Sequence, residues 1–162
     1  AEKFLEWMGG FCDLDWSVNP HWIPKFKPRK HEIWNGVNAF SVNDEWYYHM
    51  RFVKNMKGVT PILTDVPPAS TLKRSDGARS GNPTVRKAVA NGETQHVAWA
   101  CERSSGGRGF GFTGGHVHMN WQNDDNRKLM LNAILWTAKV TIPKSGVVSR
   151  TPTKDEMHEN LD

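Results

Sequence analysis

The most constraining feature of the sequence is a strand, a turn and a helix that follow one another within residues 108–139. Residues 109–112 alternate glycine with phenylalanine, which predicts a strand that another backbone or a ligand can approach closely. Gly114-Gly115-His116 follows directly, and Asn123 predicts the N-cap of a helix with a broad apolar stripe. This order is typical of α/β domains, in which ligands bind at the carboxyl end of the sheet.

Outside that unit, the sequence predicts short strands and short helices joined by loops. The expected helices lie at residues 2–8 and 84–90, the expected strands at 40–52, 58–64 and 96–102, and the expected loops at 11–28 and 66–91. Residues 104–107 predict a hairpin turn into the glycine-rich strand. We expect one α/β domain over residues 1–145 and a polar C-terminal tail over residues 146–162.

Length and cysteine content exclude several classes of protein. A chain of 162 residues suffices for one ordinary domain, and it has no run of about 18 apolar residues that would predict a membrane span. The two cysteines, Cys12 and Cys101, exclude a disulfide-rich scaffold, and a single bridge between them is left open. No leader opens the chain, and because it starts at Ala1 in an expected helix, we expect it to begin within a longer protein.

The basic side chains are unevenly distributed along the chain. The net charge is +4, and residues 51–108 carry ten basic and four acidic side chains. This excess favours an anionic partner, but it is far smaller than the dense basic stripe of a nucleic-acid-binding protein, so no nucleic acid is expected. The eight tryptophans suit either a packed core or a sugar-binding surface.

His116 and His118 are the first candidates for chemistry. In an extended segment alternate side chains point to the same side, so the two imidazoles could converge on one substrate or on one divalent metal such as zinc. A metal would need a further ligand, for which the available donors are His21, His49, Glu45 and Glu102. The alternative is that one histidine packs against the protein while the other lies in solvent.

Asp44-Glu45 is the second candidate, because a carboxylate at a strand edge beside the aromatic residues 46–48 could act as a general acid or base. The alternative is an ion pair between Glu45 and an arginine such as Arg51 or Arg79. Both cysteines are expected to be inert, since neither lies in a nucleophile elbow. Residues 104–109 lack the Gly-Lys-Ser/Thr of a phosphate-binding loop.

Six stretches, in the same order, resemble the ThuA-like (trehalose utilisation) domain over nearly the whole chain. They are Trp16-Ser-Val-Asn-Pro-His21-Trp22, Asp44-Glu45-Trp46-Tyr47-Tyr48-His49, Gly58-Val-Thr-Pro-Ile-Leu63, His96-Val-Ala-Trp99, Gly107-Arg-Gly-Phe-Gly-Phe-Thr-Gly-Gly-His116 and Asn132-Ala-Ile-Leu-Trp136-Thr-Ala. Glu45 and Tyr47 match the acidic-aromatic strand motif of that family, and His116 matches its Gly-Gly-His motif, which His118, Asn120 and Trp121 extend.

The resemblance implies a flavodoxin-like, mostly parallel sheet with flanking helices, as in the class I glutamine-amidotransferase-like superfamily, but without the amidotransferase triad. It also implies a role in the uptake and breakdown of trehalose and related glycosides, in a secreted or periplasmic protein; a cytoplasmic location is left open. Family members begin with a strand, a helix and a further strand that do not occur here, so we expect the chain to be N-terminally incomplete and to correspond to the C-terminal two-thirds of the domain.

Together these observations predict a site that binds a small carbohydrate where the sheet meets its last long helix. The predicted catalytic residues are His116 and Glu45, opening onto one cavity, with His116 and His118 as ligands if a metal binds. The predicted substrate contacts are His118, Asn120, Trp121, Tyr47 and His49. The first hypothesis is a hydrolase or lyase of a glycoside or keto-sugar pathway, and the second is a non-catalytic sugar-binding or protein-interaction module. A homo-oligomer is left open.

Overall fold

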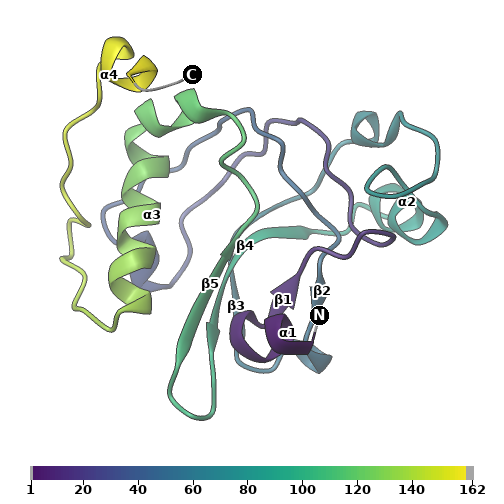
Figure 1. Cartoon of the computed structure of the whole chain (residues 1–162), viewed down its shortest axis with the longest axis horizontal. Helices are drawn as coiled ribbons and strands as arrows, with labels where there is room; N and C mark the ends of the chain where they lie inside the picture. Colours follow the sequence, from purple (N-terminus) through teal and green to yellow (C-terminus); the bar gives the residue numbers. More distant parts are fainter. Residues whose placement is uncertain (1, 160–162) are drawn as a thin grey trace.

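The computed structural model describes residues 2–159 (Figure 1). Its helices are α1 (Glu2–Met8), α2 (Pro83–Ala90), α3 (Asp124–Thr137) and α4 (Lys154–His158), and its strands are β1 (Gly10–Phe11), β2 (Arg51–Phe52), β3 (Val59–Asp65), β4 (Gln95–Glu102) and β5 (Arg108–Phe112). Four short 3-10 turns are η1 (Glu32–Trp34), η2 (Lys54–Met56), η3 (Ala69–Leu72) and η4 (His118–Gln122). The mixture of helices and strands agrees with the sequence prediction, and the side chain of Asn123 caps α3 by accepting from the Asn126 N–H.

The prediction of a flavodoxin-like, mostly parallel sheet is wrong. The strands form two small antiparallel sheets, one in the order β3-β4-β5 and one of β1 with β2. Parallel neighbours need a crossover connection of about a dozen or more residues, whereas only residues 103–107 join β4 to β5. Residues 66–94 are longer, but β4 returns antiparallel to β3, and α2 lies to one side of the sheet (Figure 1).

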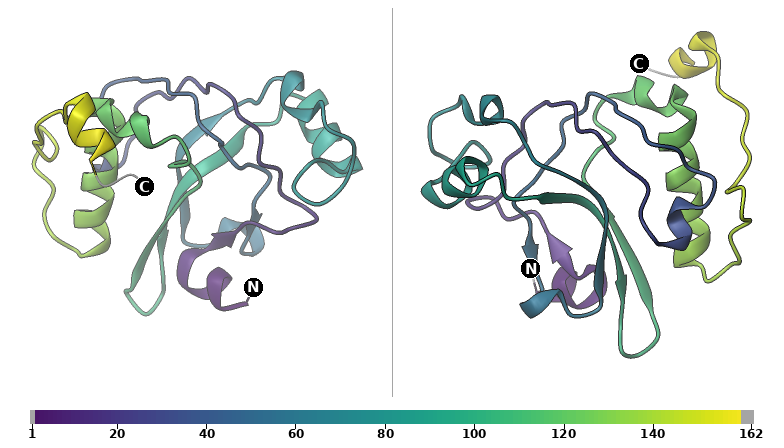
Figure 2. Two further views of the ribbon diagram at one scale, coloured as in Figure 1. Left: turned by 45° about the horizontal axis from the view of Figure 1, so that its top comes forward. Right: turned by 180° about the vertical axis from the view of Figure 1, so that it is seen from behind.

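A further antiparallel pairing, which we call the ribbon, consists of residues 18–26 and 40–48. Isolated bridges join Val18 to Tyr48, Trp22 to Asp44 and Phe26 to Phe40, so that every fourth residue is paired. Pro20 and Pro24 lie between the bridging residues and have no N–H to donate, which prevents a continuous ladder. For this reason the predicted strand at 40–52 is a regular strand only at Arg51–Phe52, and the predicted loop at 11–28 is largely extended (Figure 2).

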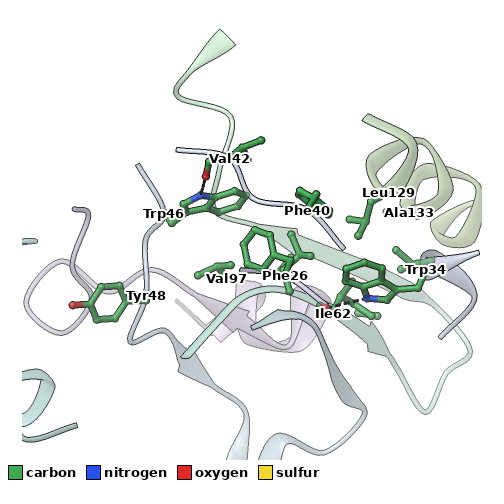
Figure 3. Close-up of a cluster of buried hydrophobic side chains, with 14 of the residues drawn as sticks. Phe26, Trp34, Phe40, Val42, Trp46, Tyr48, Ile62, Val97, Leu129 and Ala133 are labelled. Atoms are coloured by element: carbon green, nitrogen blue, oxygen red, sulfur yellow. Dashed lines mark hydrogen bonds between the residues drawn. The ribbon is translucent and has the colours of Figure 1, made fainter. Parts of the chain in front are cut away.

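The core lies between the ribbon, the three-stranded sheet and α3 (Figure 3). Phe26 is fully buried, with its ring edge-to-face against Trp46 at 5.1 Å and Phe40 at 5.2 Å between ring centroids. The buried indole N–H groups find carbonyl acceptors: Trp34 donates to Ile62 and Trp46 donates to Val42 (Figure 3). Most of the unusual tryptophan content is therefore core.

The alternating glycines of β5 serve internal packing. A Cβ at Gly111 would overlap the indole of Trp99, and one at Gly109 would overlap the backbone carbonyl of Trp7 in α1. The close approach that the sequence predicted is thus made by another part of the same chain.

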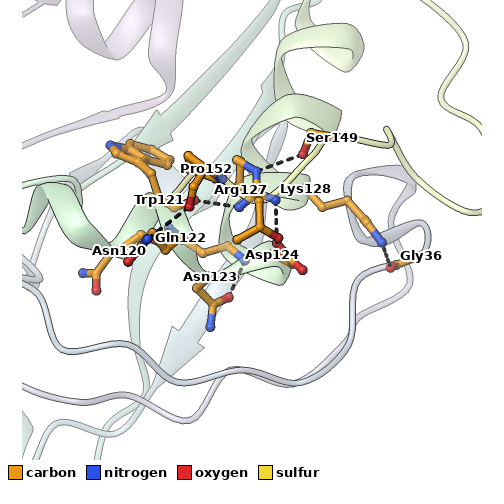
Figure 4. Close-up of polar contacts among 12 residues, drawn as sticks. Gly36, Asn120, Trp121, Gln122, Asn123, Asp124, Arg127, Lys128, Ser149 and Pro152 are labelled. Carbon is orange, nitrogen blue, oxygen red and sulfur yellow. Dashed lines mark hydrogen bonds and ion pairs between the residues drawn. The ribbon is translucent and has the colours of Figure 1, made fainter. Parts of the chain in front are cut away.

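The polar tail packs along α3 (Figure 1). Arg127 donates to the Ser149 hydroxyl, and Gln122 donates to the Pro152 carbonyl (Figure 4). Asn132, fully buried in α3, accepts from the Val147 N–H, and Met157 of α4 is buried as well. Within residues 2–159 no helix combines the length and the apolar character that crossing a bilayer requires.

Candidate functional site

Asp44 organises the loop that follows β5. Its carboxylate is only 1% exposed and accepts hydrogen bonds from the N–H groups of Gly115 at 2.8 Å and Val117 at 3.0 Å. It also accepts from the Glu45 N–H at 2.8 Å and from the Asn120 side chain at 3.0 Å. The bonds from Gly115 and Val117 fix residues 115–117, which we call the site loop, against the ribbon. All four bonds together satisfy the lone pairs of the buried carboxylate, which is stable only when they are satisfied.

Glu45 and His116 lie together in the structure. Glu45 Oε2 is 3.6 Å from His116 Nδ1, and its side chain is 18% exposed whereas that of His116 is 61% exposed. The other carboxylate oxygen, Oε1, accepts a hydrogen bond of 2.9 Å from the amide of Asn19. One side of the carboxylate is therefore held by the protein, and the other faces an accessible imidazole.

The pair stands beside a polar pocket of about 320 Å³. Its lining residues come from the ribbon, η3 and the segment after η3, and they are Asn19, Pro20, His21, Glu45, Ser70, Thr71, Lys73 and Arg74. The rings of His21 and His116 meet edge-to-face with 5.3 Å between their centroids. The polar pocket is thus lined by one carboxylate and by the imidazole of His21, and His116 contacts both of these residues.

Two of the predicted substrate contacts lie elsewhere. Tyr47 lines a separate apolar cavity of about 650 Å³ with Trp99 and Phe112. His49 stacks on Trp16 at 4.5 Å between ring centroids, its Nδ1 is 3.0 Å from the Trp16 carbonyl oxygen, and burial lowers its pKa.

The other predicted contacts surround the start of α3. The amide of Asn120 donates to Asp44 and to the Asn43 carbonyl, so it holds the site loop. Trp121 is half-buried near Phe112, and its carbonyl accepts from Arg127 (Figure 4). His118 is exposed. Contacts of these side chains with a substrate stay predictions.

The described residues do not gather a metal site. Within residues 2–159 no group of three or more His, Cys, Asp or Glu side chains is close enough to hold a metal ion. A zinc ion on His116 and His118 would therefore lack the further protein ligand that tetrahedral zinc sites have. Cys12 and Cys101 are both free thiols, and burial raises the pKa of each, which disfavours the reactive thiolate.

Several residues that line the pocket were not predicted there. His21 was predicted only as an available donor to a metal, and Asn19 was not predicted at all. Both lie in the segment that pairs with the segment of Glu45 through the Trp22–Asp44 bridge, so antiparallel pairing would have indicated that they are close. Lys73 and Arg74 follow a 3-10 turn in a polar segment without periodicity, so no local signal indicates that they line the same pocket.

Fold and site together define an α+β domain with two antiparallel sheets and a carboxylate–imidazole pair at its surface. A family model described as trehalose utilisation (ThuA) matches residues 2–137. The chain belongs to the ThuA family, as the six sequence stretches predicted. No curated protein and no solved structure shows a significant match to it.

Proposed function

We propose that this ThuA-family protein acts on a sugar bound in the polar pocket, with His116 as general acid and base and Glu45 as the carboxylate that orients it. The observation that carries the proposal is the approach of Glu45 Oε2 to His116 Nδ1 at 3.6 Å, beside a pocket lined mainly by polar and charged residues. The family description supports a sugar as the substrate, because it refers to the use of trehalose.

The geometry suits proton transfer. When Nδ1 of His116 carries a proton toward Glu45, Nε2 is the nitrogen left to accept a proton from a substrate hydroxyl. Asn19 fixes the carboxylate through its other oxygen, so the imidazole, its orienting acid and a third group form a chain. A distance of 3.6 Å exceeds a hydrogen bond, and such contacts tighten when a substrate excludes water.

Sugar hydroxyls also find partners in the pocket walls. Ser70 and His21 are exposed there and offer a hydroxyl and an imidazole, and Asn19 offers an amide. Proton transfer at a glycosidic or hydroxyl oxygen is common to hydrolysis and to elimination. We therefore propose a hydrolase or a lyase.

The test is turnover and binding of trehalose and a panel of glycosides by the wild type, His116→Ala and Glu45→Gln. We expect kcat to fall about 10²- to 10⁴-fold in His116→Ala, the usual contribution of a general acid or base. Glu45→Gln keeps the shape of the side chain but not its charge, so its loss should be smaller and should alter the pH profile. His158→Ala, which removes an exposed histidine of α4 outside the pocket, is the matched control and should behave as wild type.

Full turnover in His116→Ala, or no binding of any sugar, would overturn the proposal. Binding that survives in His116→Ala together with no turnover by the wild type would indicate a non-catalytic sugar-binding module.

A further inference from the structure

One wall of the polar pocket is cationic. Lys73 and Arg74 follow η3 directly, both are exposed, and both line the pocket with Ser70. They belong to the segment 51–108, in which basic side chains outnumber acidic ones. Glu45 is the one acidic side chain among the described residues that line the pocket.

The guanidinium of Arg74 is held in place. Its Nη2 donates to the Asn19 side-chain oxygen at 2.7 Å and to the Arg79 carbonyl at 2.8 Å. Asn19 in turn donates to Glu45, so a chain of hydrogen bonds runs from Arg74 to the carboxylate of the catalytic pair. An arginine fixed at one nitrogen keeps its remaining N–H groups available in a defined orientation.

Neither cation of this wall is neutralised by the protein. Among residues 2–159, none of the ion pairs includes Lys73 or Arg74. The nearby carboxylate in the sequence, Asp76, pairs instead with Arg86 at 2.6 Å. Among residues 2–159 neither positive charge of this wall has a carboxylate within ion-pair distance, and an anionic ligand can supply one.

We infer that the sugar bound in this pocket carries an anionic substituent, a phosphate or a carboxylate, that contacts Lys73, Arg74 and Ser70. This inference rests on the proposed function and narrows its substrate class. Lys73 supplies a point charge, and the N–H groups of Arg74 that are not bonded to Asn19 supply directed donors for an oxyanion. Repulsion between the anion and Glu45 places the anionic group at the cationic wall and turns the sugar ring toward Glu45 and His116.

The experiment measures the binding of glucose, glucose 6-phosphate, glucuronate and inorganic phosphate by calorimetry, at low and high salt. We expect the two anionic sugars to bind about tenfold or more tightly than glucose, since charge-assisted hydrogen bonds contribute this much. Added salt should reduce this advantage. The ranking of phosphate against carboxylate then identifies the anionic group.

Lys73→Gln is the informative variant, because Lys73 is exposed and its replacement should leave the fold intact. It should weaken the binding of the preferred anionic sugar about tenfold and leave glucose binding unchanged. Lys144→Gln removes an exposed lysine that does not line the pocket, and it should change neither affinity.

Equal affinity for glucose and for both anionic sugars would overturn the inference while the proposed function stands. Inorganic phosphate that binds as tightly as glucose 6-phosphate would also overturn it, because the sugar would then contribute nothing. If no sugar binds at all, the inference and the proposed function both fail.

Discussion

The three-stranded sheet and the ribbon both contribute to the core, but their polar backbone groups are satisfied differently. In the sheet, β4 is paired on both sides, with β3 and with β5. In the ribbon, only every fourth residue is paired, and side chains complete the network. Trp22 donates from its indole to the Trp46 carbonyl, and the carboxylate of Asp44 binds the site loop.

This difference shows why the site lies on the ribbon. In a continuous ladder, few backbone N–H and C=O groups are free. In an interrupted ladder, some backbone groups bond to side chains such as that of Asp44, and other side chains point outward. The stability of the ribbon therefore depends on a small number of polar side chains, whereas the stability of the sheet depends on close packing. Each dependence can be tested by single substitutions.

The largest effect is expected for Asp44→Ala. The change leaves four hydrogen-bond donors without their acceptor in a buried place, so the free energy of unfolding should fall by about 3–5 kcal/mol. Glu45→Ala, one residue further, loses the bond from Asn19 and the contact with the exposed His116, and it should cost less than about 1 kcal/mol. Denaturant unfolding followed by tryptophan fluorescence measures both.

Asp44→Asn separates charge from shape at this position. It retains one acceptor oxygen, so its loss of stability should lie between those of the two alanine variants. If Asp44→Ala were no less stable than Glu45→Ala, the assignment of the site loop to Asp44 would be wrong.

The second effect concerns the sheet. A methyl group at Gly111 overlaps the indole of Trp99, so Gly111→Ala should lower the free energy of unfolding by about 1–3 kcal/mol through overpacking. Gly107→Ala is the matched control in the adjoining turn, where the methyl group meets only the flexible head group of Arg103. Near-ultraviolet circular dichroism should show a changed Trp99 signal in Gly111→Ala alone; an unchanged spectrum would contradict the packing argument.

The third effect tests the ribbon's side-chain hydrogen bonds. Trp22→Phe keeps an aromatic ring but removes the N–H that the Trp46 carbonyl accepts, so stability should fall by about 1–3 kcal/mol. Trp7→Phe changes an indole that is 55% exposed on α1 and should have little effect. Equal losses in the two variants would show that this bond does not stabilise the ribbon.

The smallest effect is on pH dependence, where each region has one half-buried histidine. Burial lowers the pKa of His49 at the base of the ribbon and of His96 in β4. As the pH falls through the unfolded pKa of about 6.5, the unfolded chain takes up protons first, so stability decreases until the folded imidazoles are protonated too. Above that range the imidazoles are neutral in both the folded and the unfolded chain, so they no longer make stability depend on pH.

Thermal unfolding between about pH 5.5 and 7.5 measures this slope, across the range where histidine titrates. His49→Gln and His96→Gln should each flatten it without abolishing it, because burial also lowers the pKa of His31. A slope that neither substitution changes would show that these imidazoles do not contribute.

The local elements were predictable from the sequence, but their pairing was not. Caps, turns and alternating glycines lie close together in the chain, so Asn123 and residues 104–107 could be assigned correctly. Residues 103–107 are too short for parallel pairing of β4 with β5, whereas residues 66–94 are long enough for either direction between β3 and β4. The lengths of the connections alone therefore do not determine how the strands pair.

The site was predictable in part for a similar reason. Alternation along an extended segment places Glu45 outward and Asp44 inward, and the Gly-Gly-His motif indicates His116. The position of Lys73 and Arg74 in the pocket could not be predicted. They lie more than 20 residues from Asn19 and Glu45 in the sequence, in a segment without a periodic pattern, and they meet these residues only in the folded chain.

The adjacent acids on the ribbon, Asp44 and Glu45, have different roles, and this difference affects how such a protein can evolve. Asp44 stabilises the fold through its hydrogen bonds to the site loop, so we expect selection against its replacement whichever substrate the protein uses. Glu45 contributes less to folding, so the proposed chemistry with His116 is what constrains it. We expect homologous chains that keep the activity to retain both acids, and chains that have lost it to retain only Asp44.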